Sequence, residues 1–241
     1  MGGKLSIDFC RRQGVTFRPM PPSSTVVARP AGAPPTRAGW VDGLLRSAIL
    51  QGEFLPGEKL YAERLAERWG VSPTPVRETF QRLAGEGLVV IEPQKGARVA
   101  PLSVEEATEV YELRLLLDPV AVEQSVAAGR EVPSFAAEVG VAHAALVARH
   151  RSAAEYHEAH RVFHLALVSR CPNGRLVQQV AQLMAHSQRF HAVGAVASRA
   201  ADPAGEHLAL RDAAVAGDGA LAAEVLRAHL RGTLDAVRAS A

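Results

Sequence analysis

Two short helical patterns separated by a three-residue corner, residues 70–72, constrain the fold of this chain more than any other feature. The first pattern occupies residues 62–69, where apolar side chains recur at steps of three and four, as on one face of a helix. The second opens with Ser72, a good helix cap, and Pro73, which suits the first helical position because no backbone donor is needed there. Its apolar stripe consists of Val76, Phe80 and Leu83. The sequence therefore predicts a helix-turn-helix.

The segments on either side extend this motif into a larger module. Residues 40–49 form a further helical pattern that ends before Gly52. Residues 88–91 and 97–100 have the composition of short strands, and the turn between them contains Pro and Gly, as a hairpin tip requires. A helix, a helix-turn-helix and a hairpin in this order are typical of a winged helix. We therefore predict a winged helix-turn-helix DNA-binding domain over residues 39–101.

The remainder of the chain, residues 102–241, is predicted to be helical throughout. Ser103 and Glu106 have the spacing of a capping box that starts the first helix. Glycine and proline then separate further helices. The predicted helices cover residues 103–128, 134–150, 153–170, 174–199, 204–216 and 219–238. The expected fold class is thus mainly α, with an N-terminal winged helix-turn-helix followed by an all-α bundle of about six helices.

Residues 1–38 differ from the rest of the chain. They are rich in proline and show no sustained hydrophobic period, so we predict a disordered N-terminal tail. Arginines in this segment leave two interpretations open: a basic arm that contacts the DNA backbone, or an extension without a role of its own.

Composition limits where the protein acts and how it binds. The formal net charge is only +2, so any charge that faces nucleic acid has to be local. Cys10 and Cys171 are too few for a disulfide framework or a thiolate zinc site. The sequence contains no apolar run of about 18 to 20 residues and no secretory signal. We therefore expect a cytoplasmic protein that does not associate with membranes.

The outward face of the second helix of the motif carries the predicted DNA contacts, because this helix lies in the major groove of bound DNA. With the apolar stripe inward, the side chains that point outward are Thr74, Arg77, Glu78 and Gln81, with Arg82 toward the flank. Arginine can bind guanine through two parallel hydrogen bonds or contact phosphate, and a lysine at the wing tip could reach the minor groove or the backbone. Each residue alone could be a solvated surface charge; the complete ordered pattern favours DNA binding. The predicted DNA-binding residues are Ser72, Thr74, Arg77, Gln81, Arg82, Lys95 and Gly96.

The same segment resembles the DNA-binding domain of the GntR family. The matching positions are Ala48-Ile49, Gly52, Leu55-Pro56-Gly57, Leu60, Leu65-Ala66, Gly70-Val71-Ser72, Thr74-Pro75-Val76-Arg77-Glu78, Arg82-Leu83, Glu86-Gly87-Leu88-Val89 and Gly96. The resemblance implies a bacterial regulator that binds a short palindromic operator as a homodimer, usually as a repressor released by a small metabolite. The chain departs from the family at Pro73, where an arginine is usual. A DNA contact is therefore expected to be missing, with Arg77 and Arg82 carrying more of the binding.

A pair of histidines, His160 and His164, is the first indication of a metal site. One helical turn separates them, so both imidazoles project from the same face. Such a pair also arises by chance. Two further histidines, His207 near the start of one predicted helix and His229 near the end of the last, could converge with the pair inside the bundle. The other histidines, His143, His150, His157, His186 and His191, are expected to be surface or core residues, although His186 could reach the cavity.

This part of the chain is similar to the FCD effector domain of the FadR subfamily of GntR regulators. The matching stretches are Tyr111-Glu112-Leu113-Arg114 with Asp118, Phe163-His164, residues 169–173 with Leu176, His207, Gly217-Asp218 and His229-Leu230. In that family one Asp and three His bind a divalent metal ion beside a carboxylate ligand. The resemblance places His164, His207 and His229 on the three His positions and His160 on the Asp position. The length after the wing is similar to that of the VanR-like branch.

Two consequences follow from this resemblance. An imidazole in place of a carboxylate raises the charge of the site by one unit and favours Zn, Ni, Cu or Co over Mn or Mg, so Zn or Ni is expected. Arg114 matches an arginine near the ligand cavity and is expected to bind a small carboxylate effector, because a guanidinium binds carboxylates through two hydrogen bonds. An ion pair of Arg114 with Glu112 or Asp118 is the alternative.

Three functions remain open at this point. The expected one is a metabolite-responsive DNA-binding transcription regulator and not an enzyme. An architectural DNA binder, in which the histidines are packing groups, would need no effector. A metal-dependent hydrolase, in which the four histidines hold a metal that activates water, would need no DNA-reading domain, and the sequence shows no recognisable nucleophile or general-base motif.

Overall fold

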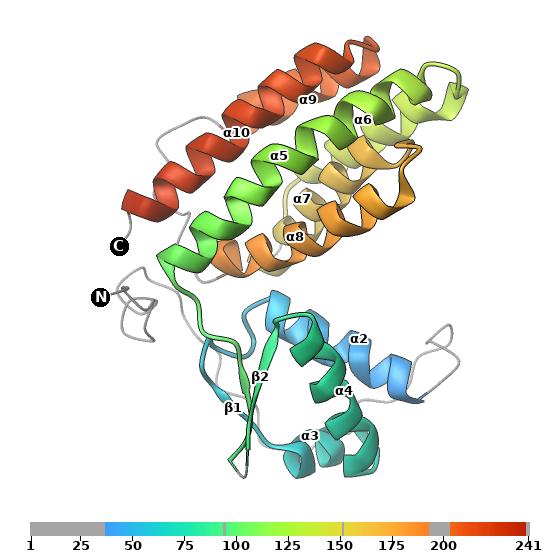
Figure 1. The fold of residues 1–241 in the computed structure, drawn as a ribbon. Helices are drawn as coiled ribbons and strands as arrows, with labels where there is room; N and C mark the ends of the chain where they lie inside the picture. Colours follow the sequence, from blue (N-terminus) through green and yellow to red (C-terminus); the bar gives the residue numbers. More distant parts are fainter. Residues whose placement is uncertain (1–36, 94, 151, 193–202, 240–241) are drawn as a thin grey trace. The chain divides into compact units, whose positions relative to one another are not determined.

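The computed structural model describes residues 37–93, 95–150, 152–192 and 203–239 (Figure 1). The chain forms two compact units, the first ending at Leu102 and the second starting at Ser103. All but the last two residues of the predicted tail lie outside the described residues, as do the hairpin-turn residue Gln94 and residues 193–199 of the fourth predicted helix of the bundle.

Within residues 37–102, as far as the structure describes them, the N-terminal unit contains three helices and a small sheet. Its helices are α2 (Arg37–Leu50), α3 (Ala62–Trp69) and α4 (Pro73–Gly85). The hairpin strands β2 (Val89–Glu92) and β3 (Gly96–Val99) follow α4. This order confirms the predicted winged helix-turn-helix.

A third strand, β1 (Lys59–Leu60), was not predicted. It pairs antiparallel with β3, with Leu60 opposite Ala97, and gives the sheet order β1-β3-β2. A strand of two residues is too short to show the alternation by which strands are recognised in a sequence.

Gly70 permits the corner between α3 and α4. Its φ of 62° lies in the left-handed region, which glycine adopts without the cost that a side chain would add. Ser72 has the extended backbone of a cap residue, but its side chain makes no capping hydrogen bond to α4, contrary to the sequence-based expectation. The predicted stripe of α4 is buried, with Val76 and Leu83 fully so.

The C-terminal unit is a helical bundle, as predicted. Its elements are α5 (Val104–Gly129), α6 (Pro133–Val147), α7 (Ala153–Val168), α8 (Gly174–Ala192), α9 (Pro203–Val215) and α10 (Gly219–Ala239). The Oγ of Ser103 accepts a hydrogen bond of 3.0 Å from the backbone N–H of Glu106, so the predicted cap starts α5. Figure 1 shows α5 between α10 and α8, and the core includes the fully buried Tyr111, Phe163 and Leu226. Within the described residues, no helix combines the length and apolarity that crossing a membrane requires.

The junction of α5 and α6 has no room for a side chain at Gly129. A Cβ there would lie 2.4 Å from the ring of Phe135, which is buried. We expect Gly129→Ala to lower the free energy of unfolding by about 1–3 kcal/mol, because an overpacked core must shift its rings off their preferred rotamers. Gly140→Ala is the matched control: it lies inside α6 with nothing within 4 Å of a built Cβ, and should stabilise by roughly 0.5–1 kcal/mol. Urea unfolding of the two variants checks this prediction, and equal effects would contradict it.

Candidate DNA interface and candidate metal centre

The solvent-facing side of α4 carries polar side chains opposite its buried stripe. The exposed residues of this face are Ser72, Thr74, Arg77, Glu78, Gln81 and Arg82. Their exposure follows from the helical period, because the positions between the buried ones face away from α2 and α3. At the wing, Lys95 and Gly96 are also exposed. All seven side chains or backbone positions predicted to bind DNA are therefore accessible.

The two arginines of α4 lie in different surroundings. Arg77 donates a hydrogen bond of 2.5 Å to the carboxylate of Glu63 on α3, and both side chains are exposed. Arg82 instead turns toward α2, where its guanidinium binds Asp42 at 3.1 Å and the carbonyl of Ala38 at 3.2 Å. Arg77 is thus paired with one exposed carboxylate, whereas the guanidinium of Arg82 is bonded to helix α2.

A groove of about 440 Å³ separates α4 from the wing. Its lining includes Arg77, Gln81, Lys95 and Gly96 of the predicted set. Lys59 of β1 also lines the groove; it was not among the predicted DNA-binding residues because a two-residue strand leaves no recognisable pattern in the sequence.

Another exposed basic side chain of this unit was not predicted from the sequence. Arg64, on the first turns of α3, is exposed, and its guanidinium lies 4.8 Å from the centre of the Tyr61 ring. Arg64 lies between the buried residues Ala62 and Leu65 of α3. The helical period of the sequence already placed it on the outward side of the helix.

In the C-terminal unit, four imidazoles from three helices converge. Their candidate ligand atoms all lie within 4.8 Å of one another. Two of them, His160 and His164, lie one turn apart on the same face of α7, and their Nε2 atoms are only 3.2 Å apart. His207 enters from α9 and His229 from α10. Two ligands of one tetrahedral zinc ion are roughly 3.3 Å apart, so this spacing suits a shared cation.

The protonation of the cluster also suits a metal. Burial, followed by the charges of neighbouring imidazoles, lowers the pKa of both His160 and His164 well below the ordinary value. Both rings are therefore neutral near pH 7, and each offers a lone pair. Among the described residues, Nδ1 of His164 is buried without a hydrogen-bond partner.

Glu206 orients one ring of the cluster. Its carboxylate lies 2.8 Å from Nδ1 of His229, so this nitrogen carries the proton and Nε2 keeps its lone pair. A carboxylate behind a ligating imidazole is the usual supporting contact of metal-bound histidine. The residues present thus fit a divalent cation in their donor type, spacing and protonation.

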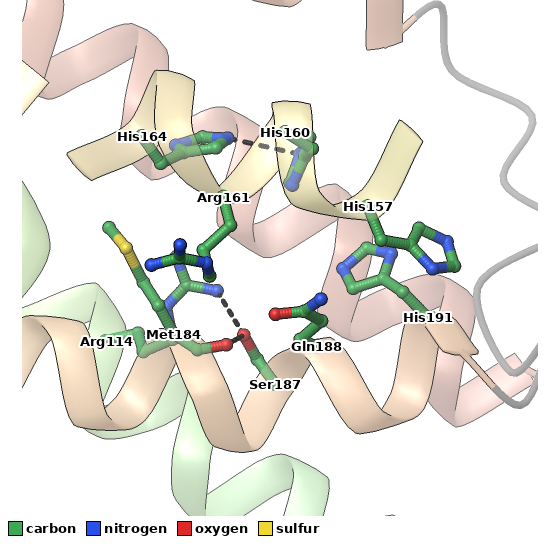
Figure 2. A pocket seen from close by; sticks show the side chains of 9 residues that line it. All are labelled: Arg114, His157, His160, Arg161, His164, Met184, Ser187, Gln188 and His191. Carbon is green, nitrogen blue, oxygen red and sulfur yellow. Dashed lines mark hydrogen bonds between the residues drawn. The ribbon is translucent and has the colours of Figure 1, made fainter. Parts of the chain in front are cut away.

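A narrow pocket lies beside this cluster, between α7 and α8 (Figure 2). Its enclosed space is about 20 Å³, which suits one water-sized group, since a water needs roughly 10–15 Å³. The residues that line it are Arg114, His157, His160, Arg161, His164, Met184, Ser187, Gln188 and His191. None of these is an Asp or a Glu, so the lining is cationic or neutral.

Arg114 reaches this pocket from α5 but is also paired. It binds Asp118 at 2.8 Å and donates a hydrogen bond of 2.8 Å to Oγ of Ser187. Burial raises the pKa of Asp118 and the charge of Arg114 opposes that rise. The ion pair that the sequence left open is therefore formed with Asp118 and not with Glu112, and Arg114 also lines the pocket.

Several pocket residues were not assigned from the sequence. His157 and His191 line the pocket, although both were expected to be surface or core residues; His186, the one expected to reach it, is not among its lining residues. The hydroxyl of Tyr111 lies 3.3 Å from Nε2 of His191. The buried face of α8 is interrupted by three polar residues, Ser187, Gln188 and His191. Polar residues on an otherwise buried helix face were the feature of the sequence that could have indicated this pocket.

Comparison with known families identifies the domain that carries each of these two sites. Residues 39–99 match the family described as "Bacterial regulatory proteins, gntR family", and residues 109–232 match the FCD domain. The chain belongs to the GntR family. As an FCD-containing GntR protein it is a DNA-binding transcription regulator, and the four-histidine cluster lies within the FCD domain.

Individual relatives agree with this placement. An uncharacterised HTH-type transcriptional regulator of Paraburkholderia xenovorans, BphR, is 31% identical over 202 residues, covering 80% of this chain and 82% of the relative. The transcriptional repressor GlaR of Escherichia coli is 29% identical over 198 residues, covering 77% and 89%. The solved structure of E. coli McbR/YncC shares the fold, with a TM-score of 0.71 at 23% identity over 85% of this chain and 98% of that one.

Proposed function

We propose that this GntR-family regulator is a homodimeric repressor whose FCD domain senses a small carboxylate beside a divalent metal ion. The observation that carries the proposal is the contact between the four-histidine cluster and the Arg114 pocket within one domain. GlaR and a relative from Paenarthrobacter nicotinovorans are named as repressors, the latter as probable, which supports repression as the output. The six helices found in the described part of the bundle support the VanR-like branch of the FadR subfamily.

For the metal, the all-imidazole cluster of His160, His164, His207 and His229 favours zinc or nickel over magnesium or manganese, because neutral nitrogen ligands suit the former ions. When bound, the cation would supply a positive centre that attracts a carboxylate. Arg114 supplies a second positive group at the same pocket, and Glu206 keeps His229 in the tautomer that ligates.

For the DNA, the proposed contacts are those of the exposed α4 face and the wing. Arg77 and Gln81 are proposed to reach base edges, and Thr74 and Lys95 the sugar-phosphate backbone. Ser72 and Gly96 offer backbone groups at the two ends of this face. Arg82 is proposed to contact phosphate from the flank, where its bonds to α2 fix its position.

The effector pocket has a direct physical link to the start of α5. Arg189 of α8, next to Gln188, binds Glu106 in the first turn of α5 at 3.3 Å. Arg114 and Ser187 form a second bridge between the same two helices. A carboxylate that draws Arg114 away from Ser187 would shift α8 against α5, the helix that continues the chain from the DNA-binding domain. Such coupling is reciprocal: effector weakens operator binding by the same factor as operator weakens effector binding.

The test of this proposal uses the full-length protein loaded with Zn²⁺ and a labelled DNA fragment from upstream of its own gene. Fluorescence anisotropy measures operator affinity with and without each member of a panel of small carboxylates. At least one acid is expected to raise the operator Kd by about 5-fold to 150-fold. If no acid changes the affinity while the metal is bound, the proposed mechanism fails.

The architectural alternative predicts a different result. If the histidines only pack, the purified protein contains no stoichiometric metal, and a chelator leaves its thermal stability unchanged. The hydrolase alternative gains no support from the pocket, because Glu206, the carboxylate at the cluster, is engaged with His229 and is not among the pocket-lining residues.

The proposed dimer uses the uncovered face of α5. Leu113, Leu116 and Val120 recur there at helical spacing and are 48%, 67% and 40% exposed, although all three are large and apolar. A self-complementary apolar stripe on one helix suits a two-fold axis, where the same patch of each subunit meets its copy.

We expect Leu116→Asn to weaken the dimer by more than about 30-fold, because each of the two subunits would bury an amide at a cost of roughly 1–3 kcal/mol. Analytical ultracentrifugation over a range of protein concentrations measures the shift. Val141→Asn on α6 is the matched control, since Val141 is 71% exposed but lies outside the α5 stripe. A dimer that tolerates Leu116→Asn and dissociates with Val141→Asn would place the interface elsewhere.

A further inference from the structure

Two histidines outside the four-histidine cluster continue it along the pocket between α7 and α8. His157 lies about one turn before His160 on α7, and His191 comes from α8. The ring centre of His191 lies 5.6 Å from that of His160 and 6.2 Å from that of His157. Figure 2 shows His164, His160 and His157 in this order along α7, with His191 beside His157. A row of imidazoles therefore leads away from the cluster toward two half-buried side chains, those of His157 and His191.

Gln188 adds an oxygen to this end of the pocket. It lies three residues before His191, on the same face of α8. Gln188 is only 7% exposed, and its Oε1 is buried without a hydrogen-bond partner among the described residues. An unpaired buried acceptor is costly, so this oxygen calls for a positive partner. The enclosed space of about 20 Å³ admits a single water-sized group, which is the size of a metal ion with little of its hydration shell.

The charges around this space do not prevent a cation from entering it. Both arginines that line the pocket are paired with carboxylates, Arg114 with Asp118 and Arg161 with Glu158. Burial lowers the pKa of His157, which keeps its imidazole neutral. Neutral imidazoles are ligands for zinc and nickel, and an amide oxygen is a weaker ligand of the same ions. This end of the pocket thus offers two nitrogens and one oxygen to a divalent cation.

These three donors suit a cation on its way in and not a second resident one. Two divalent cations this close together repel each other strongly, so the end of the pocket and the cluster are not filled at the same time. The cluster offers four nitrogens and is the stronger site. A hydrated cation also has to give up its waters before it is buried, and exchanging them stepwise for protein ligands avoids a bare charge in the interior. His160 lies 4.5 Å from His164 and 5.6 Å from His191 between ring centres, so it can contact a cation at either place.

We infer that His157, His191 and Oε1 of Gln188 form an entry site that takes up Zn²⁺ from solution and passes it to the four-histidine cluster through His160. The inference rests on the proposed function, since it concerns how the metal of that centre arrives. It assigns these three residues to the rates of zinc loading and release and not to the affinity of the filled centre.

The test follows zinc transfer from a chromophoric chelator to the metal-free, full-length protein by stopped-flow absorbance. In Gln188→Leu, His157→Ala and His191→Ala, loading should be at least about tenfold slower than in the parent, and release to excess EDTA should slow by the same factor. The Kd from competition should then stay within about twofold of the parent value, because a site on the route changes the barrier in both directions and not the end states.

Two further variants sharpen the test. Gln188→Glu keeps an oxygen ligand and adds a negative charge, so it should load faster than the parent. His150→Ala is the matched control: it removes an imidazole that is bound to the carbonyl of Leu146 and does not line the pocket, so it should load at the parent rate.

The outcomes separate the entry site from the metal centre. Parent-like loading in Gln188→Leu, His157→Ala and His191→Ala overturns the entry site and leaves the centre standing. A raised Kd with faster release in these variants also overturns it, because the residues would then hold the metal in the centre or support its fold. If the parent protein takes up no zinc from the chelator, the centre itself fails, and the inference fails with it.

Discussion

Replacing His207 by alanine is expected to weaken Zn²⁺ binding by at least about 100-fold. Loss of a mere supporting contact to a metal ligand typically costs 10-fold to 100-fold, and His207 is proposed as a ligand itself. Its ring centre lies 4.9 Å from that of His160 and 4.8 Å from that of His229, so its removal opens one side of the cluster. Competition with a chromophoric chelator measures the change in Kd.

Thermal unfolding gives a second readout of the same prediction. At a zinc concentration of 100 times the parent Kd, the parent protein gains about 2.7 kcal/mol of stability, and a variant that binds 100-fold more weakly gains only about 0.4 kcal/mol. His150→Ala is the matched control: it removes an imidazole that is bound to the carbonyl of Leu146 and lies outside the cluster. Equal zinc binding by the parent and His207→Ala, or an equal loss in His150→Ala, would exclude the proposed centre.

The DNA-binding unit was largely predictable because its signals are local. Gly70 supplies the left-handed corner, Pro73 starts α4, and the buried stripe of α4 follows the helical period. Strand β1 was missed because it exists only through its pairing with β3, nearly 40 residues later. The surroundings of Arg82 were also beyond local reasoning, since its partners lie on α2.

The effector pocket was predicted less completely for the same reason. The one-turn spacing of His160 and His164 is a local feature. The approach of His207 and His229 was expected from their places on two predicted helices and from the family resemblance. Which face of α8 meets α7 depends on packing across the bundle, so Gln188 and His191 were not assigned. A short sequence window does not contain that packing.

Arg77→Ala is expected to produce the largest loss of operator affinity among single changes on α4. A bidentate arginine–guanine contact is worth roughly 1–3 kcal/mol, and a dimer makes it twice, so operator binding should weaken by about 2–6 kcal/mol, or more than about 30-fold. Binding to unrelated DNA should change far less, because it depends on phosphate contacts. Anisotropy titrations with the operator and a scrambled fragment, at several salt concentrations, separate the two effects.

Arg82→Ala is the matched control, because it removes the same side chain from the same helix. Its guanidinium is held by Asp42 and by the carbonyl of Ala38, so its proposed contact is to phosphate, and its loss should lower affinity for both fragments alike. A larger operator-specific loss for Arg82 than for Arg77 would move the base-reading face toward α2. Because Pro73 has no hydrogen-bond donor, it cannot share the base contact with Arg77. The effect of removing Arg77 should therefore lie toward the upper end of the expected range.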